Sequence, residues 1–307
     1  MKASAPGKII LFGEHAVVYN RPALAVPVTQ VHVDVEVSAS SRKGTWIHAP
    51  AIDLHDELNS LPVGHPIGSV ILKVFQRFDI SFPSALDISI ESTIPVAAGL
   101  GSGAAVSVAL IRALSGYFNQ LLTDEEVSSL AYEIEKLHHG TPSGIDNTVI
   151  TYGKPVYFIK GKPLETFKVA KSFMIIIGDT GISAPTKKAV SDVRQLWMHN
   201  KDNIETIFNE IAQISLTGRR SIESGRPELL GELMDQNHEY LQVLTVSSPE
   251  LDKLVETARH AGALGAKLSG SGRGGNMIAL VKEDKAESVA EALLSKGAKR
   301  TIITEIK

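Results

Sequence analysis

The sequence contains no cysteine among its 307 residues. This absence excludes disulfides, thiolate nucleophiles and metal sites with cysteine ligands. Aromatic residues are few, at 6%, and neither charge sign dominates, since 31 Lys and Arg against 34 Asp and Glu give a net charge of −3. Such a balance provides no global attraction to nucleic acid or to an anionic membrane. With 43% hydrophobic residues, the chain suits one large globular domain or two lobes.

The start of the chain also lacks the long apolar core and small-residue cleavage site of an export signal, so we expect a cytoplasmic protein. One uncharged run, residues 92–111, has about the length of a bilayer span. A proline and three glycines between residues 95 and 103 weaken a helix, however. We therefore interpret this run as a loop that leads into a buried helix.

Hydrophobic periodicity predicts mixed secondary structure in the first half of the chain. Alternating apolar and polar residues predict half-buried strands over residues 31–38 and 85–91. A capping-box start and apolar residues at helical spacing predict a helix over residues 123–137. Further strands are predicted over residues 155–159 and 173–177, the second of them buried on both faces.

The second half is richer in helix. The predicted helices cover residues 189–216, 227–244 and 249–261, and a closing strand, helix and strand cover 277–281, 285–295 and 300–306. We therefore predict an α+β fold with two domains. The amino-terminal domain spans residues 1–165 and the carboxy-terminal domain spans residues 166–307.

Three glycine-rich segments are candidates for ligand binding. In the first, residues 6–16, a short strand over 9–12 is flanked by Lys8 on one side and Glu14 and His15 on the other. Taken alone, this segment fits a surface hairpin with a solvated lysine, and His15 fits a hydrogen-bonded core histidine equally well.

The second glycine-rich segment, residues 95–105, continues into an apolar stretch. Its glycines permit tight turns, and Ser102 can cap the helix that follows. The first-turn amides of such a helix bind anions, for example the phosphates of a nucleotide. The spacing matches neither the dinucleotide fingerprint nor the P-loop. Close packing of helices is the alternative explanation for the small residues.

The third segment, residues 267–276, has more glycine and serine than a turn needs and precedes an apolar strand. Its backbone amides suit an anion-binding nest, with a flexible linker as the alternative.

Two carboxylates form a further candidate site. Glu135 lies near the end of a predicted helix, and Asp146 follows beyond a turn rich in Pro, Ser and Gly. If the turn folds back, one carboxylate can hold a metal ion and the other can accept a proton. Alternatively, Asp146 only stabilises the turn through its side chain. The adjacent His138 and His139 do not match a zinc motif.

Taken together, these segments resemble the GHMP kinase superfamily. The match consists of PGK…GEH at residues 6–15, P…GLGS at 95–102 and KLSGSG at 267–272, in the order of that family. Within the family, GEHAVVY at 13–19, HGTPSGIDN at 139–147, and GDTG with APTK between 178 and 187 resemble the branch that acts on mevalonate.

The resemblance implies a two-lobed fold. Its amino-terminal lobe is similar to domain 2 of ribosomal protein S5, and its carboxy-terminal lobe is helix-rich and ferredoxin-like. It also implies ATP-dependent phosphorylation of the C5 hydroxyl of mevalonate to 5-phosphomevalonate, a step of isoprenoid biosynthesis, with Mg²⁺ as cofactor. We expect the small-molecule substrates ATP and mevalonate as partners, with no nucleic acid and no membrane, and a homodimer stays open.

The resemblance also assigns residues. Asp146 would accept the proton of the attacking hydroxyl, with Lys8 beside it, and Glu135 and Ser102 would hold Mg²⁺. The residues implied for the triphosphate are Pro95, Gly99, Leu100, Gly101, Ser102, Gly103 and Ala104. The residues implied for mevalonate are Glu14, His15 and Thr186, and Ser271 and Gly272 would support mevalonate or the triphosphate.

Two positions depart from the family pattern. Gly103 stands where a second serine is usual, and Arg273 interrupts the third glycine run, where it either contacts a phosphate or carboxylate or projects into solvent. Three alternative functions stay open: mevalonate 3-kinase, phosphomevalonate kinase, and a non-catalytic nucleotide- or RNA-binding protein. The lysine-rich stretch 154–171 would serve the last, although a solvated face explains it as well.

Overall fold

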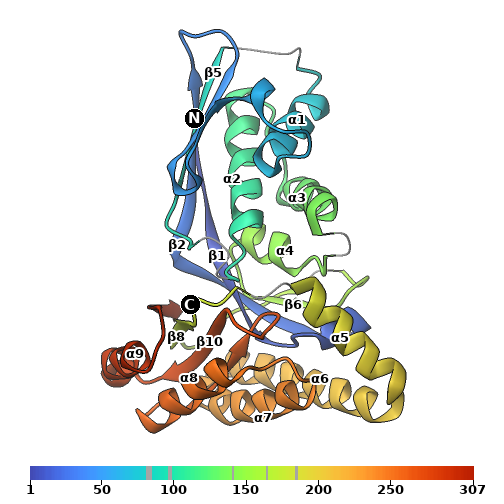
Figure 1. Ribbon diagram of the computed structural model, residues 1–307, viewed down its shortest axis with the longest axis vertical. Helices are drawn as coiled ribbons and strands as arrows, with labels where there is room; N and C mark the ends of the chain where they lie inside the picture. The colour runs from blue at the N-terminus through green and yellow to red at the C-terminus, as the bar shows by residue number, and fades with distance from the viewer. Residues whose placement is uncertain (81–84, 96–98, 140–141, 164, 184–185) are drawn as a thin grey trace. The chain divides into compact units, whose positions relative to one another are not determined.

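The computed structural model describes residues 1–80, 85–95, 99–139, 142–163, 165–183 and 186–307 (Figure 1). The chain forms two compact units. The first unit comprises Met1–Gly7, Val31–Val96 and Leu100–Gly153, and the second comprises Lys8–Gln30, Ala97–Gly99 and Lys154–Lys307. Strands β1 (Lys2–Phe12) and β2 (Ala23–Ala39) contribute residues to both units. The family-domain boundary near residue 165 is a different division of the chain and stays a prediction.

The first sheet has seven strands in the order β4-β3-β5-β2-β6-β7, with β1 paired to β2. The remaining strands are β3 (Thr45–Ala49), β4 (Leu54–Glu57), β5 (Leu86–Ser92), β6 (Val156–Phe158) and β7 (Glu165–Thr166). In the first unit, β2 runs antiparallel to β5, and Val35 pairs with Ile90. Both side chains are buried, as the alternating pattern predicted.

Four helices of the first unit lie on one side of its strands (Figure 1). They are α1 (Pro66–Arg77), α2 (Ser102–Tyr117), α3 (Asp124–His139) and α4 (Ile145–Tyr152). The predicted capping box starts α3, because Thr123 Oγ1 accepts from the Glu126 N–H at 3.3 Å and Glu126 Oε2 accepts from the Thr123 N–H at 2.9 Å. Residues 102–111 of the uncharged run form the first part of the mostly buried α2. Within the described residues, none of the helices combines the length and apolar character that a membrane span requires.

The second sheet belongs to the second unit and is antiparallel, in the order β11-β8-β10-β9. Its strands are β8 (Phe173–Asp179), β9 (Gly265–Ser269), β10 (Asn276–Val281) and β11 (Arg300–Ile306). The fourth strand thus lies beside the first and the third beside the second, with helices between β8 and β9 and between β10 and β11. This arrangement is the ferredoxin-like βαββαβ pattern.

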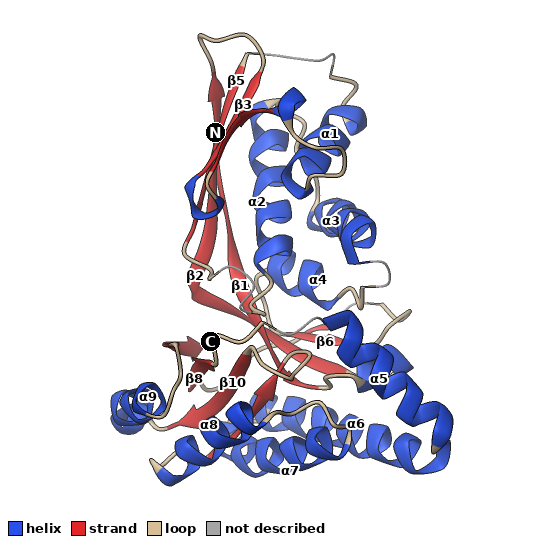
Figure 2. Cartoon of the chain, viewed as in Figure 1, coloured by secondary structure: helices blue, strands red, loops and turns tan. Residues whose placement is uncertain are grey.

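The helices of the second unit are α5 (Thr186–His199), α6 (Lys201–Glu223), α7 (Leu230–Val243), α8 (Pro249–His260) and α9 (Ala286–Ser295), drawn in blue in Figure 2. The single helix predicted over 189–216 is wrong, because Asn200 leaves the helical region at φ −142° and ψ 60° and separates α5 from α6. Ser248 caps α8 by accepting the Leu251 N–H at 3.3 Å. Short 3₁₀ helices cover Ala16–Tyr19, Pro50–Ile52, Leu58–Ser60, Pro227–Leu229 and Glu283–Lys285.

Candidate active site

The first glycine-rich segment ends β1 and turns into the interior of the second unit. The predicted short strand is the last part of the longer β1, and Glu14 and His15 follow it with only 1% and 6% of their surfaces exposed. Lys8, within the strand, is 4% exposed. The alternative of a surface hairpin with a solvated lysine is therefore wrong.

A buried ion pair joins this segment to the third one. The Lys267 ammonium, fully buried on β9, donates to Glu14 Oε1, and its Nζ also donates to the Leu268 carbonyl at 2.5 Å. Burial raises the pKa of Glu14 and lowers the pKa of Lys267, and the attraction between the two charges opposes both shifts. The charge of Lys8 also opposes the rise in the pKa of Glu14. The second carboxylate oxygen, Glu14 Oε2, is buried without a hydrogen-bond partner among the described residues.

His15 makes a second connection to the third segment. Its Nε2–H donates to the Ser271 carbonyl at 3.0 Å, and the Thr186 hydroxyl donates to Ser271 Oγ at 3.1 Å. Burial lowers the pKa of His15 to about 4, so the ring is neutral near pH 7 and its Nδ1 is left as an acceptor. Three of the residues predicted for the mevalonate side, His15, Thr186 and Ser271, are thus linked within the second unit.

The third segment is a buried strand followed by a tight turn, and the flexible-linker alternative is wrong. Ser269 Oγ donates to the Ile10 carbonyl at 2.9 Å and accepts from the Ile10 N–H at 3.3 Å, which attaches β9 to β1. Gly272 has φ +75°, and a Cβ there would lie 1.8 Å from the Val246 carbonyl oxygen. Glycine is therefore required at this position by both backbone conformation and space.

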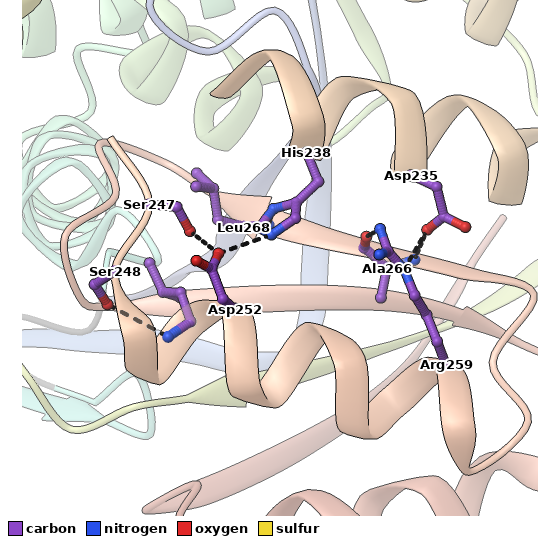
Figure 3. A network of polar contacts seen from close by, with 9 residues as sticks. Asp235, His238, Ser247, Ser248, Asp252, Arg259, Ala266 and Leu268 are labelled. Atoms are coloured by element: carbon purple, nitrogen blue, oxygen red, sulfur yellow. Dashed lines mark hydrogen bonds and ion pairs between the residues drawn. The ribbon is translucent and has the colours of Figure 1, made fainter. Parts of the chain in front are cut away.

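A polar network of residues from α7 and α8 holds β9, the strand that carries Lys267 (Figure 3). His238 Nε2–H donates to Asp252 Oδ1 at 3.0 Å, while His238 Nδ1 accepts the Leu268 N–H at 3.3 Å. Asp252 also accepts from Ser247 Oγ at 2.5 Å. Burial lowers the pKa of His238 to about 4, so this ring is also neutral near pH 7. One turn along α7, Asp235 Oδ1 accepts the Ala266 N–H at 2.9 Å.

Arg273 neither projects freely into solvent nor needs a substrate anion as its partner. Its Nη1 forms an ion pair with Asp192 Oδ2 on α5, and its Nε donates to the Thr245 carbonyl at 3.2 Å. The side chain therefore connects the third segment to α5.

In the first unit, the second glycine-rich segment leads directly into α2. Gly101, at φ +76°, occupies the N-cap position without a side-chain cap, and Ser102 is the first helical residue. The prediction that Ser102 caps the helix is therefore wrong, because the left-handed Gly101 takes that position. The first-turn amides keep the orientation that binds anions. Residues 96–98 of this segment lie outside the described residues.

The two predicted carboxylates of the first unit lie on successive helices. Glu135 is half-buried on α3, and Asp146 is half-buried in the first turn of α4, just after the left-handed Gly144. Asn147 Nδ2 donates to the Ser128 carbonyl at 3.0 Å and to Ser128 Oγ at 2.9 Å, which attaches α4 to α3. The motif residues 140–141 and 184–185, and the side chains of residues 138 and 139, lie outside what the structure describes.

The predicted residues thus fall into two sets. Lys8, Glu14, His15, Gly99, Thr186, Ser271 and Gly272 belong to the second unit, whereas Pro95, Leu100 to Ala104, Glu135 and Asp146 belong to the first. The expectation that Lys8 lies beside Asp146 stays a prediction.

Sequence reasoning gave no role to three residues that hold the site segments of the second unit: Lys267, His238 and Asp192. A signal existed for Lys267, because a lysine between Ala266 and Leu268 in a buried strand needs a partner for its charge. No local pattern marked His238, or the pairing of Asp192 with Arg273, which lies 81 residues away in the sequence.

Two family models match the chain: GHMP kinases N terminal domain over residues 66–154 and GHMP kinases C terminal over residues 219–299. The matches fall in the expected order and cover α1 to α4 in the first unit and the end of α6 through α9 in the second. The chain belongs to the GHMP kinase family.

Its relatives narrow this assignment. The chain is 37% identical to a mevalonate kinase of Thermococcus sibiricus, over 99% of this chain and 95% of the relative, and 36% identical to that of Pyrococcus furiosus with the same coverage. Among solved structures, it resembles L. major mevalonate kinase in complex with R-mevalonate, at a TM-score of 0.87, 28% identity and coverage of 100% and 96%. Methanococcus jannaschii mevalonate kinase follows at a TM-score of 0.85, 28% identity and coverage of 99% and 97%. Within the GHMP kinases, the chain groups with the mevalonate kinases.

Proposed function

We propose that this protein is an ATP-dependent mevalonate kinase, which transfers the γ-phosphoryl group of ATP to the C5 hydroxyl of mevalonate. One observation carries the proposal: the likeness to proteins named mevalonate kinase extends over nearly the whole of both chains at 36–38% identity. The neighbour that was solved with R-mevalonate also matches along the whole chain.

In this proposal Asp146 accepts the proton of the attacking hydroxyl, and Lys8 stabilises the negative charge that develops on that oxygen. Asp146 lies in the first turn of α4, and the hydrogen bonds of Asn147 attach this helix to α3. The backbone that carries the Asp146 carboxylate is therefore held in place. Phosphoryl transfer needs positioning and charge neutralisation more than covalent help, so a held carboxylate and a lysine suit the reaction.

The triphosphate is proposed to bind along the backbone from Pro95 and Gly99 to Ala104, at the start of α2. The described residues contain no group of three or more His, Asp or Glu side chains that could hold a metal ion by itself. Mg²⁺ in phosphoryl-transfer sites usually takes only one or two protein oxygens and completes its shell with phosphates and water. The Glu135 carboxylate and the Ser102 hydroxyl fit that donor set and are proposed to hold it. Bound there, Mg²⁺ would neutralise charge on the phosphates.

The mevalonate side is proposed to comprise Glu14, His15 and Thr186, supported by Ser271 and Gly272. Glu14 Oε2 is a buried acceptor without a partner among the described residues, as a ligand hydroxyl requires. The neutral His15 ring, fixed by its bond to Ser271, adds a second acceptor at Nδ1.

A coupled ADP-release assay tests the function. Mevalonate, phosphomevalonate, homoserine and galactose are supplied in turn with MgATP, and the position of the new phosphate is read by ³¹P and ¹³C NMR. We expect turnover with mevalonate and a phosphate on C5. Phosphorylation at C3, or turnover of phosphomevalonate alone, would replace the proposal by the corresponding related kinase. No turnover combined with RNA retention on a filter would favour the non-catalytic alternative.

The role of Asp146 is tested by Asp146→Asn, which keeps the size of the side chain but removes its basicity. We expect turnover to fall by at least about 10³-fold while ATP binding, measured by calorimetry, stays nearly unchanged. Near-wild-type turnover would exclude Asp146 as the proton acceptor. A homodimer and a cytoplasmic location stay predictions, which light scattering and cell fractionation would test.

A further inference from the structure

Helix α5 carries Thr186 at its first position, far from the partly buried Leu196 and Trp197 that pack its other end against the core. Among its fourteen residues only Ala189 and Val193 are buried, whereas nine residues of α6 are buried. Segments with few buried apolar contacts open at lower free energy than the core does. The position of Thr186 therefore depends strongly on the polar contacts that the first half of α5 makes.

Two such contacts connect α5 with the third glycine-rich segment. Thr186 Oγ1 donates to Ser271 Oγ at 3.1 Å, and two residues further along the segment the Arg273 guanidinium pairs with Asp192. The first contact joins two neutral hydroxyls, and the second is a charge-assisted bond, which is the stronger kind. Hydrogen bonding to Arg273, followed by that to Lys188, lowers the pKa of Asp192, which keeps its carboxylate ionised.

The backbone conformation at Arg273 also indicates that its side chain has a role, because glycine would adopt this conformation with less strain. Arg273 has φ +59°, between glycines at φ +75° and +137°. A residue with a Cβ costs about 1–2 kcal/mol in this left-handed region. The backbone N–H of Arg273 donates to the Val246 carbonyl at 2.7 Å, and its Nε donates to the Thr245 carbonyl, so the guanidinium faces α5 from a fixed base. A glycine would adopt the same turn without strain but would leave Asp192 without this partner.

We propose that Arg273 is a positioning residue for the substrate side of the site: through Asp192 it holds the first half of α5, and with it Thr186, against Ser271. This inference rests on the proposed function, since Thr186 and Ser271 are proposed to face mevalonate. Arg273 itself needs no contact with the substrate. Its loss should therefore weaken mevalonate binding and leave both the chemical step and ATP binding almost unaffected.

Arg273→Gly removes the guanidinium and also relieves the backbone strain, so the variant should fold. We expect its KM for mevalonate to rise about five- to tenfold, with kcat and the KM for ATP within about twofold of wild type. Asp192→Asn should reproduce this pattern, and the double variant should be no worse than either single variant. Lys188→Ala is the matched control, because it removes the other cation that contacts Asp192 and keeps the connection to the loop. It should leave the KM values at wild-type levels.

Hydrogen exchange in the unliganded protein tests the same connection without substrate. Amides over residues 186–193 should exchange faster in Arg273→Gly than in wild type, while those of α7 should not change. Unchanged exchange in α5, or an unchanged KM for mevalonate, would overturn the inference. If wild type itself does not turn over mevalonate, the proposed function fails instead, and the exchange experiment still decides whether Arg273 holds α5.

Discussion

In the second unit, hydrogen bonds of side chains join the segments around Glu14 and Lys267. In the first unit, the start of α2 offers a ligand mainly backbone N–H groups, since its cap residue is a glycine. Glu14 meets Lys267, His15 meets Ser271, and Ser269 meets Ile10, all across more than 250 residues of sequence. At the start of α2 the cap position is instead a glycine without a side-chain cap.

This difference matches what each set of residues is proposed to bind. A small hydroxy acid is distinguished by side chains held at fixed positions, and these need partners that hold them. A triphosphate is common to many enzymes and can be bound by amides and a helix dipole. We therefore expect side-chain substitutions to cost most folding stability in the second unit, whereas at the start of α2 substitutions that alter the backbone or add a hydroxyl should matter most.

Lys267→Met should have the largest effect on folding stability. It leaves the Glu14 carboxylate buried without its cation, and breaking a buried pair in this way costs about 3–5 kcal/mol. We expect a large fall in the free energy of unfolding, measured in urea, together with the loss of most mevalonate turnover. The loss of stability should be confined to amides of the second unit in hydrogen exchange.

The double variant Glu14→Gln with Lys267→Met is the matched control. It removes both charges, so much of the lost stability should return while mevalonate turnover stays low. Full stability in Lys267→Met alone would show that the pair does not hold the two segments together. The second unit would then be no more dependent on side chains than the first.

Sequence patterns predicted elements and motifs better than their contacts. The alternation in β2 and the capping box of α3 are local signals, and the structure confirms both. The break at Asn200 was missed because α5 and α6 share one helical periodicity, which continues across the break. The role of Ser102 was misjudged because serine is a good cap, but the left-handed Gly101 occupies the cap position and Ser102 is the first helical residue.

The partners in the site are long-range, which explains why sequence reasoning left them open. Lys267 belongs to the KLSGSG motif at 267–272, yet nothing near it in the sequence indicates that Glu14 is its partner. Arg273 was left between a ligand and solvent, and its actual partner, Asp192, lies 81 residues away on a helix with no motif of its own at that position. Such pairs depend on how distant segments pack together, which local patterns do not encode.

Lowering the pH is a second way to test the comparison between the two units, through their stability. The buried histidines with a lowered pKa, His15 and His238, both belong to the second unit. Both are neutral when folded down to about pH 4 but take up a proton near pH 6.5 when unfolded. The unfolded state therefore binds more protons in this window, and stability falls as pH falls from 6.5 to 4. Each histidine contributes a slope of about 1.4 kcal/mol per pH unit.

We expect amides of the second unit to lose protection between pH 6.5 and 4 more steeply than amides of the first, as measured by hydrogen exchange corrected for intrinsic rates. His238→Gln should reduce that slope by about half. His199→Gln, at an exposed position of the same unit, should not change it. Equal slopes in the two units would contradict the assignment of buried neutral histidines to the second.

The smallest effect is expected from Gly103→Ser in the first unit. A Cβ at Gly103 would meet no atom within 4 Å, and the residue lies in the first turn of α2. Serine should therefore stabilise the helix by about 0.5 kcal/mol relative to glycine. Its hydroxyl should also offer one more contact to the triphosphate, so the KM for ATP should fall about two- to threefold.

Gly103→Ala separates these two contributions, because alanine favours the helix by about 1 kcal/mol over glycine but carries no hydroxyl. If the start of α2 binds the triphosphate, the KM for ATP should fall only in the serine variant, although the alanine variant is the more stable of the two. Equal KM values for ATP in both variants would mean that position 103 does not face the phosphates. The first unit would then bind the nucleotide through some other part of its backbone, and the contrast between its backbone-built site and the side-chain-built second unit would lose its support.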